Sequence, residues 1–157
     1  MKALTVLVIA GFALAGCATA PVKAPDFENS RAFQVPFDKT WGAIVAVIAE
    51  NAFPIEAIEK ESGIITTKPT LFANTWKAEK LIDSLAVRPG VFLGVWTKGR
   101  FTLSVFATKV NDTVTGVKVT SNIEAYEGNI TYSWHPCQSK GIIEKAFLNN
   151  IAQKLKQ

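Results

Sequence analysis

The sequence predicts an α+β fold in which an antiparallel β-sheet packs against two amphipathic helices. Residues 100–110 and 117–125 alternate apolar and polar side chains, a pattern typical of strands with one buried and one exposed face. Residues 39–51 and 139–156 carry apolar side chains at helical spacing. Because a sheet with one apolar face must cover it, we expect the two helices to form that cover. The length of 157 residues suits one domain.

The N-terminus has the pattern of an export signal. Lys2 is followed by an uncharged, largely apolar stretch from Ala3 to Gly16, which is shorter than the roughly 20 residues that a spanning helix needs. The stretch ends in Leu14-Ala15-Gly16-Cys17, which resembles the lipobox of bacterial lipoproteins. The resemblance implies cleavage between Gly16 and Cys17 and acylation of Cys17. The alternative is an ordinary signal peptide with a chance cysteine.

The resemblance divides the chain into a signal peptide (1–16), a lipidated N-terminus with a flexible tether (17–30), and a single α+β periplasmic domain (31–157). Acyl chains such as palmitate on Cys17 would make the membrane a partner of the protein, since two chains already hold a protein stably. The residue after Cys17 is Ala18 rather than aspartate. By analogy with enteric lipoproteins, this favours the outer membrane, with the domain facing the periplasm.

Charge and motifs exclude several classes of function. The formal net charge is +4, removal of residues 1–16 takes Lys2 with it, and no block of five like charges occurs. Nucleic acid is therefore not an expected partner. His135 is the single histidine, which excludes a multi-histidine metal site, and no phosphate-binding glycine loop or hydrolase motif occurs. We expect no metal, no cofactor and no enzymatic activity, although catalytic groups could still assemble from distant segments.

The first half of the domain has clear signals. Ala32 to Val35 alternates and predicts a short strand that ends at Pro36. Asp38 is the expected N-cap of a helix over 39–51. Its apolar stripe consists of Trp41, Ile44, Val45, Ile48 and Ala52. Residues 54–59 and 63–68 flank a turn signal and predict a β-hairpin.

The second half is dominated by strands. Residues 69–90 could hold a short helix over 76–85 or form a long loop. We expect a strand over 91–97, a turn at Lys98-Gly99, a strand over 100–110, a turn at 111–113 and a strand that continues to residue 125. The predicted last helix covers 139–156, with Ile143, Phe147, Ile151 and Leu155 on its apolar face.

Three segments carry a resemblance to a known family. They are Phe37-Asp38-Lys39-Thr40-Trp41 at the start of the first helix, Glu61-Ser62-Gly63-Ile64-Ile65-Thr66-Thr67 in the hairpin, and residues 137–144 before the last helix. With the order of elements, they resemble the helix-grip domains of a lipoprotein component of the β-barrel assembly machinery and of related small outer-membrane lipoproteins. The resemblance covers residues 31–156 and implies a helix-grip-like fold. That component has two such domains and a long docking segment, whereas this chain has one domain and a short tether.

Four aromatic residues are candidates for a contact surface. Trp76, Trp96 and Trp134 lie in or beside loops and strand ends, where tryptophans either line a groove or close the ends of a small core. Phe106 faces away from Phe101 and its apolar neighbours on the same strand, so we expect it to be exposed.

Cys137 is the second cysteine, and it has no intrachain partner if Cys17 is acylated. We expect it to be a small buried apolar residue. His135 and Cys137 could form a thiol–base pair, but Pro136 between them disfavours a regular central strand.

These observations favour a non-enzymatic outer-membrane lipoprotein that serves as a periplasmic interaction or accessory module of the cell envelope, with an envelope protein as a possible partner. The alternative is a small-molecule or lipid carrier with a cavity between the sheet and the C-terminal helix. The oligomeric state has no signal in the sequence.

Overall fold

The computed structural model describes residues 26–157, so Gly16, Cys17 and the predicted signal peptide lie outside the described residues. The elements follow one another along the chain as β1 (Ser30–Phe33), α1 (Phe37–Glu50), β2 (Ile55–Glu59), β3 (Ile64–Thr67), β4 (Thr70–Asn74), α2 (Glu79–Leu85), β5 (Ala86–Val87), β6 (Trp96–Lys109), β7 (Thr115–Glu127), β8 (Ser133–Ser139) and α3 (Ile142–Lys154). No described helix is long and apolar enough to cross a membrane.

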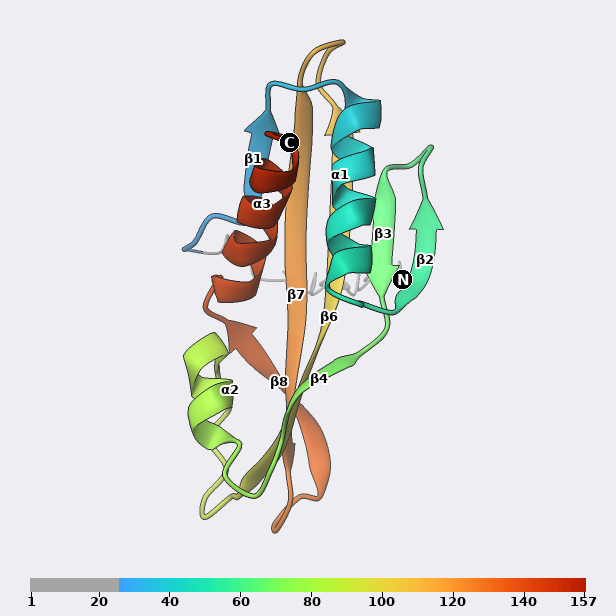
Figure 1. The fold of residues 1–157 in the computed structure, drawn as a ribbon. Helices are drawn as coiled ribbons and strands as arrows, with labels where there is room; N and C mark the ends of the chain where they lie inside the picture. The colour runs from blue at the N-terminus through green and yellow to red at the C-terminus, as the bar shows by residue number, and fades with distance from the viewer. Residues whose placement is uncertain (1–25) are drawn as a thin grey trace, which may run out of the picture.

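The eight strands within residues 26–157 form one antiparallel sheet built around β6 and β7. These two strands pair from Trp96 opposite Glu127 to Lys109 opposite Thr115. The strand order is β2-β3-β6-β7-β8-β5, while β4 also pairs with β6 and β1 also pairs with β7. Figure 1 shows α1 and α3 side by side across one face of β6 and β7. The predicted α+β fold with two covering helices is confirmed.

The main core lies between this face and the two helices. On the sheet side, the core contains Leu103 and Val105 of β6, which are buried as the alternation predicts. On the helix side, it contains Ile44 of α1 and Leu148 and Ile151 of α3. A second, smaller cluster lies under α2. It consists of Ala73, Ala78, Ile82, Trp96 and Ala125.

The first helix begins earlier than predicted. Pro36 is its N-cap, and Asp38 already lies within the helix without capping it. A proline fits this position because its fixed φ suits the helix start, where its missing N–H is not needed. The Asp38 carboxylate instead pairs with Lys60 in the β2–β3 turn, 2.7 Å away. Ala52 lies beyond the helix with a φ of 53° and is exposed, so it is not part of the apolar stripe.

The predicted strand over 91–97 and the predicted turn at 98–99 are wrong. Residues 91–95 form a loop, and β6 runs without interruption through Lys98 and Gly99. Lys98-Gly99 has turn composition, but the glycine serves close packing: a Cβ there would come within 2.5 Å of the Phe72 ring. The register shifts between Trp96 and Lys98, which marks a bulge opposite Glu127 and Tyr126.

The predicted hairpin over 54–68 is confirmed as β2 and β3. β2 is an edge strand, and all five of its residues are exposed. The loop alternative for residues 69–90 is replaced by β4, α2 and β5.

The sequence pattern does not predict β8, because Pro136 lies in its middle. This residue pairs with Glu124 of β7, and on its other side no described strand is paired with it, since β5 pairs only with Gln138 and Ser139. Proline is tolerated in a strand at such an edge. Because Ser139 ends β8, the last helix begins at Ile142 rather than at residue 139.

Gly63 and Gly42 provide a matched test of the fold. Gly63 has a φ of 71°, and a Cβ there would lie 2.0 Å from the carbonyl oxygen of Ala107, whereas a Cβ on Gly42 in α1 has no neighbour within 4 Å. We expect Gly63→Ala to lower the free energy of unfolding by about 2 kcal/mol or more, since the left-handed conformation alone costs an alanine roughly 1–2 kcal/mol. Gly42→Ala should raise it by about 0.5–1 kcal/mol. Urea denaturation measures both, and equal effects of the two substitutions would contradict the described hairpin geometry.

Candidate functional site

Two loops meet at one end of the sheet and form a surface that we call the tip. They are residues 91–95, which precede β6, and residues 128–132, which connect β7 to β8. Both lie at the lower end of the molecule in Figure 1. The backbone N–H of Gly128 donates to the carbonyl of Val95 at 2.8 Å, which joins the loops directly.

A single carboxylate organises the tip. Glu127 is the last residue of β7 and is fully buried. Its two oxygens accept hydrogen bonds from the backbone N–H groups of Val95, Asn129, Ile130 and Thr131 at 2.5–3.0 Å. The Thr131 hydroxyl donates a further bond at 3.0 Å. Because these donors come from both loops, the carboxylate fixes one loop relative to the other.

The surroundings of Glu127 determine its charge. Burial by itself raises the pKa of this carboxyl, but the backbone N–H bonds from Thr131, Asn129, Val95 and Ile130 outweigh burial and lower the pKa to about 2. Hydrogen bonds to the ionised form favour that form, so the side chain stays a carboxylate at neutral pH. The negative charge of Glu127 is therefore buried within the tip and is stabilised there by these N–H donors.

Asn129 makes a second connection between the loops. Its side-chain oxygen accepts a bond from the Val95 N–H at 2.7 Å, and its side-chain nitrogen donates to the Leu93 carbonyl at 2.9 Å. The two loops are therefore held together by side-chain as well as backbone bonds.

Large apolar side chains project from this fixed backbone. The exposed fractions are 87% for Phe92, 72% for Leu93, 54% for Ile130 and 65% for Tyr132. Leu93 and Tyr132 have φ angles of 56° and 49°, a left-handed backbone that is unfavourable for side chains other than glycine. An exposed apolar cluster on a strained, hydrogen-bonded backbone is typical of a contact site.

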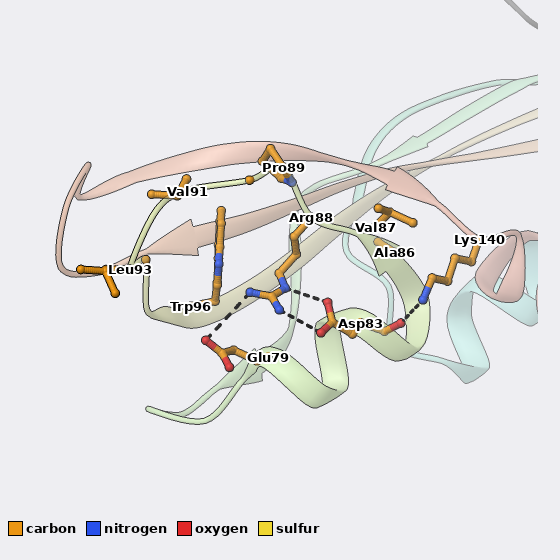
Figure 2. Close-up of a pocket in the computed structure, with 12 residues that line it drawn as sticks. Glu79, Asp83, Ala86, Val87, Arg88, Pro89, Val91, Leu93, Trp96 and Lys140 are labelled. Atoms are coloured by element: carbon orange, nitrogen blue, oxygen red, sulfur yellow. Dashed lines mark hydrogen bonds and ion pairs between the residues drawn. The ribbon is translucent and has the colours of Figure 1, made fainter.

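A hollow of about 460 Å³ adjoins the tip. Figure 2 shows Leu93 at the end of the hollow opposite Lys140, with Trp96 and Arg88 between them. The Arg88 guanidinium makes two hydrogen bonds to the Asp83 carboxylate, at 2.7 and 2.9 Å, and lies 3.9 Å from a Glu79 oxygen. This pairing lowers the pKa of the Asp83 carboxyl and raises the pKa of Arg88.

Arg88 therefore has a structural role in the hollow. Its guanidinium lies 5.4 Å from the centre of the Trp96 ring and links α2 to the start of β6. Since its charge is already matched by Asp83 and Glu79, we do not assign it as a binding group for an anion.

The four predicted contact residues do not form one surface. Trp96 is 2% exposed and belongs to the core under α2, so it offers almost no contact surface and follows the predicted alternative of closing the end of a small core. The bulge at the start of β6 turns its side chain inward. Trp76 is 71% exposed in the loop before α2. Trp134 is half-buried against Tyr126 and lies 4.0 Å from the Arg100 guanidinium on the side of the sheet opposite the helices.

Phe106 is exposed, as predicted, but it lies far along β6 from the tryptophans. It is opposite Ile64 of β3 and Lys118 of β7, on the sheet face that the helices leave uncovered. It also lines a hollow of about 700 Å³ beside the β2–β3 turn.

His135 and Cys137 are not arranged as a nucleophile and its base. The His135 Nε2 atom lies 2.7 Å from the Thr131 hydroxyl and 3.1 Å from the Ser133 hydroxyl. The Cys137 thiol contacts the backbone carbonyl of His135 at 3.6 Å instead of the imidazole. Cys137 is half-buried, and burial raises the pKa of its thiol, which disfavours the reactive thiolate.

A second buried carboxylate, Glu144, fixes the start of α3. It accepts bonds from the Ser121 hydroxyl at 2.7 Å and from the Ser139 hydroxyl at 3.0 Å, and thereby ties the helix to β7 and β8. Beyond this network, Phe147, Leu148 and Ile151 fill the space between α3 and the sheet. The hollows of about 460 and 700 Å³ lie elsewhere, at the two ends of β6.

The sequence pattern does not predict the tip. It assigns Phe92 and Leu93 to a strand, although Gly90 and Gly94 on either side of them are a loop signal. Residues 128–129, Gly-Asn, are a similar signal at the start of the other loop. The local sequence pattern does not indicate that Glu127, which directly precedes this Gly-Asn pair, is buried.

Among residues 26–157, no group of three histidine, cysteine, aspartate or glutamate side chains could hold a metal ion. No known protein-family model matches the chain, and no curated protein matches it significantly.

Replacement of Glu127 tests the organisation of the tip. In the wild type, stability that depends on the ionised carboxylate is present above the ordinary glutamate pKa of about 4.5 and is lost as pH falls towards 2. Glu127→Gln retains one acceptor oxygen but places an amide against N–H donors, so we expect lower stability at pH 7 and a weaker acid dependence. Urea denaturation from pH 7 to pH 2 measures both effects.

The exposed residue Glu56 of β2 provides the control. Glu56→Gln should leave the pH profile of unfolding close to that of the wild type. Amide hydrogen exchange at Val95 and at residues 129–131 should accelerate in Glu127→Gln alone. Unchanged exchange there would show that the carboxylate does not hold the loops.

Proposed function

We propose that the protein is a non-enzymatic lipoprotein of a bacterial outer membrane and serves as a periplasmic interaction module of the cell envelope. The observation that carries the proposal is the tip: four large apolar side chains, Phe92, Leu93, Ile130 and Tyr132, are exposed on two loops whose backbones are hydrogen-bonded to each other. A fixed apolar surface of this kind favours binding, because little conformational entropy is lost when it meets a partner.

The sequence supports the tethered part of the proposal. Leu14-Ala15-Gly16-Cys17 directly follows the apolar stretch, and the described fold begins only at the residues around Ser30. The intervening segment would connect an acylated Cys17 to the domain. Acyl chains would keep the domain within reach of the envelope, so a contact surface of modest affinity could still be occupied.

The packing beneath α3 favours an interaction module over a carrier. A carrier of the expected kind needs an apolar cavity between this helix and the sheet. Leu148 and Ile151 are fully buried there and fill the interface together with Phe147.

Acylation of Cys17 is testable directly. Labelled palmitate should enter the wild-type protein in its bacterial host, because the thiol of Cys17 follows the lipobox. Cys17→Ala should abolish the label, whereas Cys137→Ala, the matched control at the other cysteine, should retain it. Label in the Cys17→Ala protein would overturn the assignment.

The role of the tip is tested by complementation of a deletion strain. We expect the wild-type protein to restore the envelope phenotype, and we expect Cys17→Ser and the double variant Phe92→Ser/Ile130→Ser to fail. Val110→Ser is the matched control, because Val110 is 62% exposed in the turn at the opposite end of β6. Full restoration by the double variant would remove the tip from the mechanism.

A further inference from the structure

We infer that the tip binds a lipid bilayer, and that it inserts into the same membrane leaflet that holds the acyl chains of Cys17. The inference rests on the proposed lipidation and adds a second contact between domain and membrane. Phe92, Leu93, Ile130 and Tyr132 would enter the boundary between headgroups and acyl chains.

The composition of the tip fits a lipid surface. Residues 89–97 and 128–134 contain no charged side chain. The one acidic group at their junction, Glu127, is buried and hydrogen-bonded. Phenylalanine, leucine and isoleucine favour the apolar side of a membrane interface, and tyrosine favours the interface itself. The tip therefore presents a surface that a bilayer can accept without burying a charge.

The hydrogen bonds of the tip lower the penalty for insertion of these loops. An unpaired backbone N–H or carbonyl is unfavourable in lipid, and this excludes most loops from membranes. Here the side chains of Glu127 and Asn129 accept the Val95 N–H, and Glu127 also accepts the N–H groups of residues 129–131. The carbonyls of Leu93 and Val95 are also bonded within the tip.

The path of the chain brings the tether to the same end of the domain. β1 is antiparallel to β7, and Ser30 lies opposite Lys118 while the carbonyl of Asn29 accepts from Val119. Since β7 runs towards the tip, the chain before Ser30 enters from the side of the tip. The ring of Phe27 lies against Gly141, beyond the end of β8, which agrees with this direction.

The length of the tether allows both contacts at once. Along β7, Glu127 is nine residues beyond the partner of Ser30, a distance of about 30 Å in a strand. The thirteen Cα–Cα steps from Cys17 to Ser30 can span at most about 45 Å. Acyl chains on Cys17 and the side chains of the tip can therefore reach one membrane surface.

Exposed lysines near the tip complement an anionic membrane. Lys77 lies in the loop before α2, Lys80 in the first turn of α2, and Lys98 near the start of β6. Basic side chains at the level of the headgroups strengthen the binding of an apolar surface to anionic lipids.

Spin labels on the lipidated full-length protein test the insertion. The protein is reconstituted in vesicles of phosphatidylethanolamine with a minor fraction of phosphatidylglycerol. Nitroxides are attached to Phe92→Cys, Ile130→Cys or Val110→Cys in a Cys137→Ser background. At positions 92 and 130, collisions with oxygen, which concentrates in the bilayer, should exceed collisions with a water-soluble nickel chelate. At position 110, the matched exposed position at the far end of β6, the chelate should dominate.

A binding assay separates the tip from the anchor. The mature, unacylated chain with Cys17→Ser should bind the same vesicles weakly, and Phe92→Ser or Ile130→Ser should each reduce its partition coefficient by about tenfold, as expected when one apolar side chain leaves lipid. Val110→Ser should leave it unchanged.

The outcomes distinguish the two proposals. If palmitate does not label Cys17 but the tip-dependent binding persists, the proposed lipidation fails and the membrane contact of the tip stands. If the protein is acylated and the labels at positions 92 and 130 are as accessible to the chelate as the label at position 110, the tip does not insert. Crosslinking of that same tip to a protein in cells would then assign it to a protein partner and overturn the inference.

Discussion

The antiparallel pairing of β6 with β7 is the constraint on which the remaining elements depend. The pairing places one apolar face under α1 and α3, and the outer edges of the two strands carry β3, β4, β1 and β8. The pair at the tip end of this ladder is Trp96 opposite Glu127. Residues 91–95 lead into Trp96, and residues 128–132 follow Glu127. The ladder thus brings residues 91–95 beside residues 128–132, and the Glu127 carboxylate converts this proximity into a fixed arrangement.

The local sequence pattern predicts the strands and helices in which the same face is buried along the whole element. Alternation places Leu103 and Val105 on the buried face of β6, and helical spacing identifies α1 and α3, because burial there repeats with the period of the backbone. The failures have long-range causes. Gly99 has turn composition but packs beneath Phe72, and Pro136 is tolerated because the sheet leaves it at an edge. These neighbours are distant in sequence and carry no local signal.

The candidate site shows the same division. The pattern locates the tryptophans at strand ends and in loops, but whether each faces the core or solvent depends on long-range features such as the bulge in β6. Glu127 and Glu144 are buried because partners elsewhere in the chain supply hydrogen bonds, from Val95 in one case and Ser121 in the other. A carboxylate at a strand end or in a first helical turn is ordinarily exposed, so no pattern distinguishes these two from the others.

The edge strand β2 has a consequence if the protein is anchored in a membrane, as proposed above. A strand with unpaired N–H and carbonyl groups can align with the same strand of a neighbouring molecule, and two-dimensional confinement increases such encounters. In β2, Ile55, Ala57 and Ile58 would favour this alignment, but Glu56 and Glu59 are exposed beside them and repel an identical strand. At the opposite end of the sheet, β5 has only two residues, too few to recruit another chain. Charge on β2 and the brevity of β5 would therefore disfavour edge-to-edge pairing of neighbouring copies at these two strands.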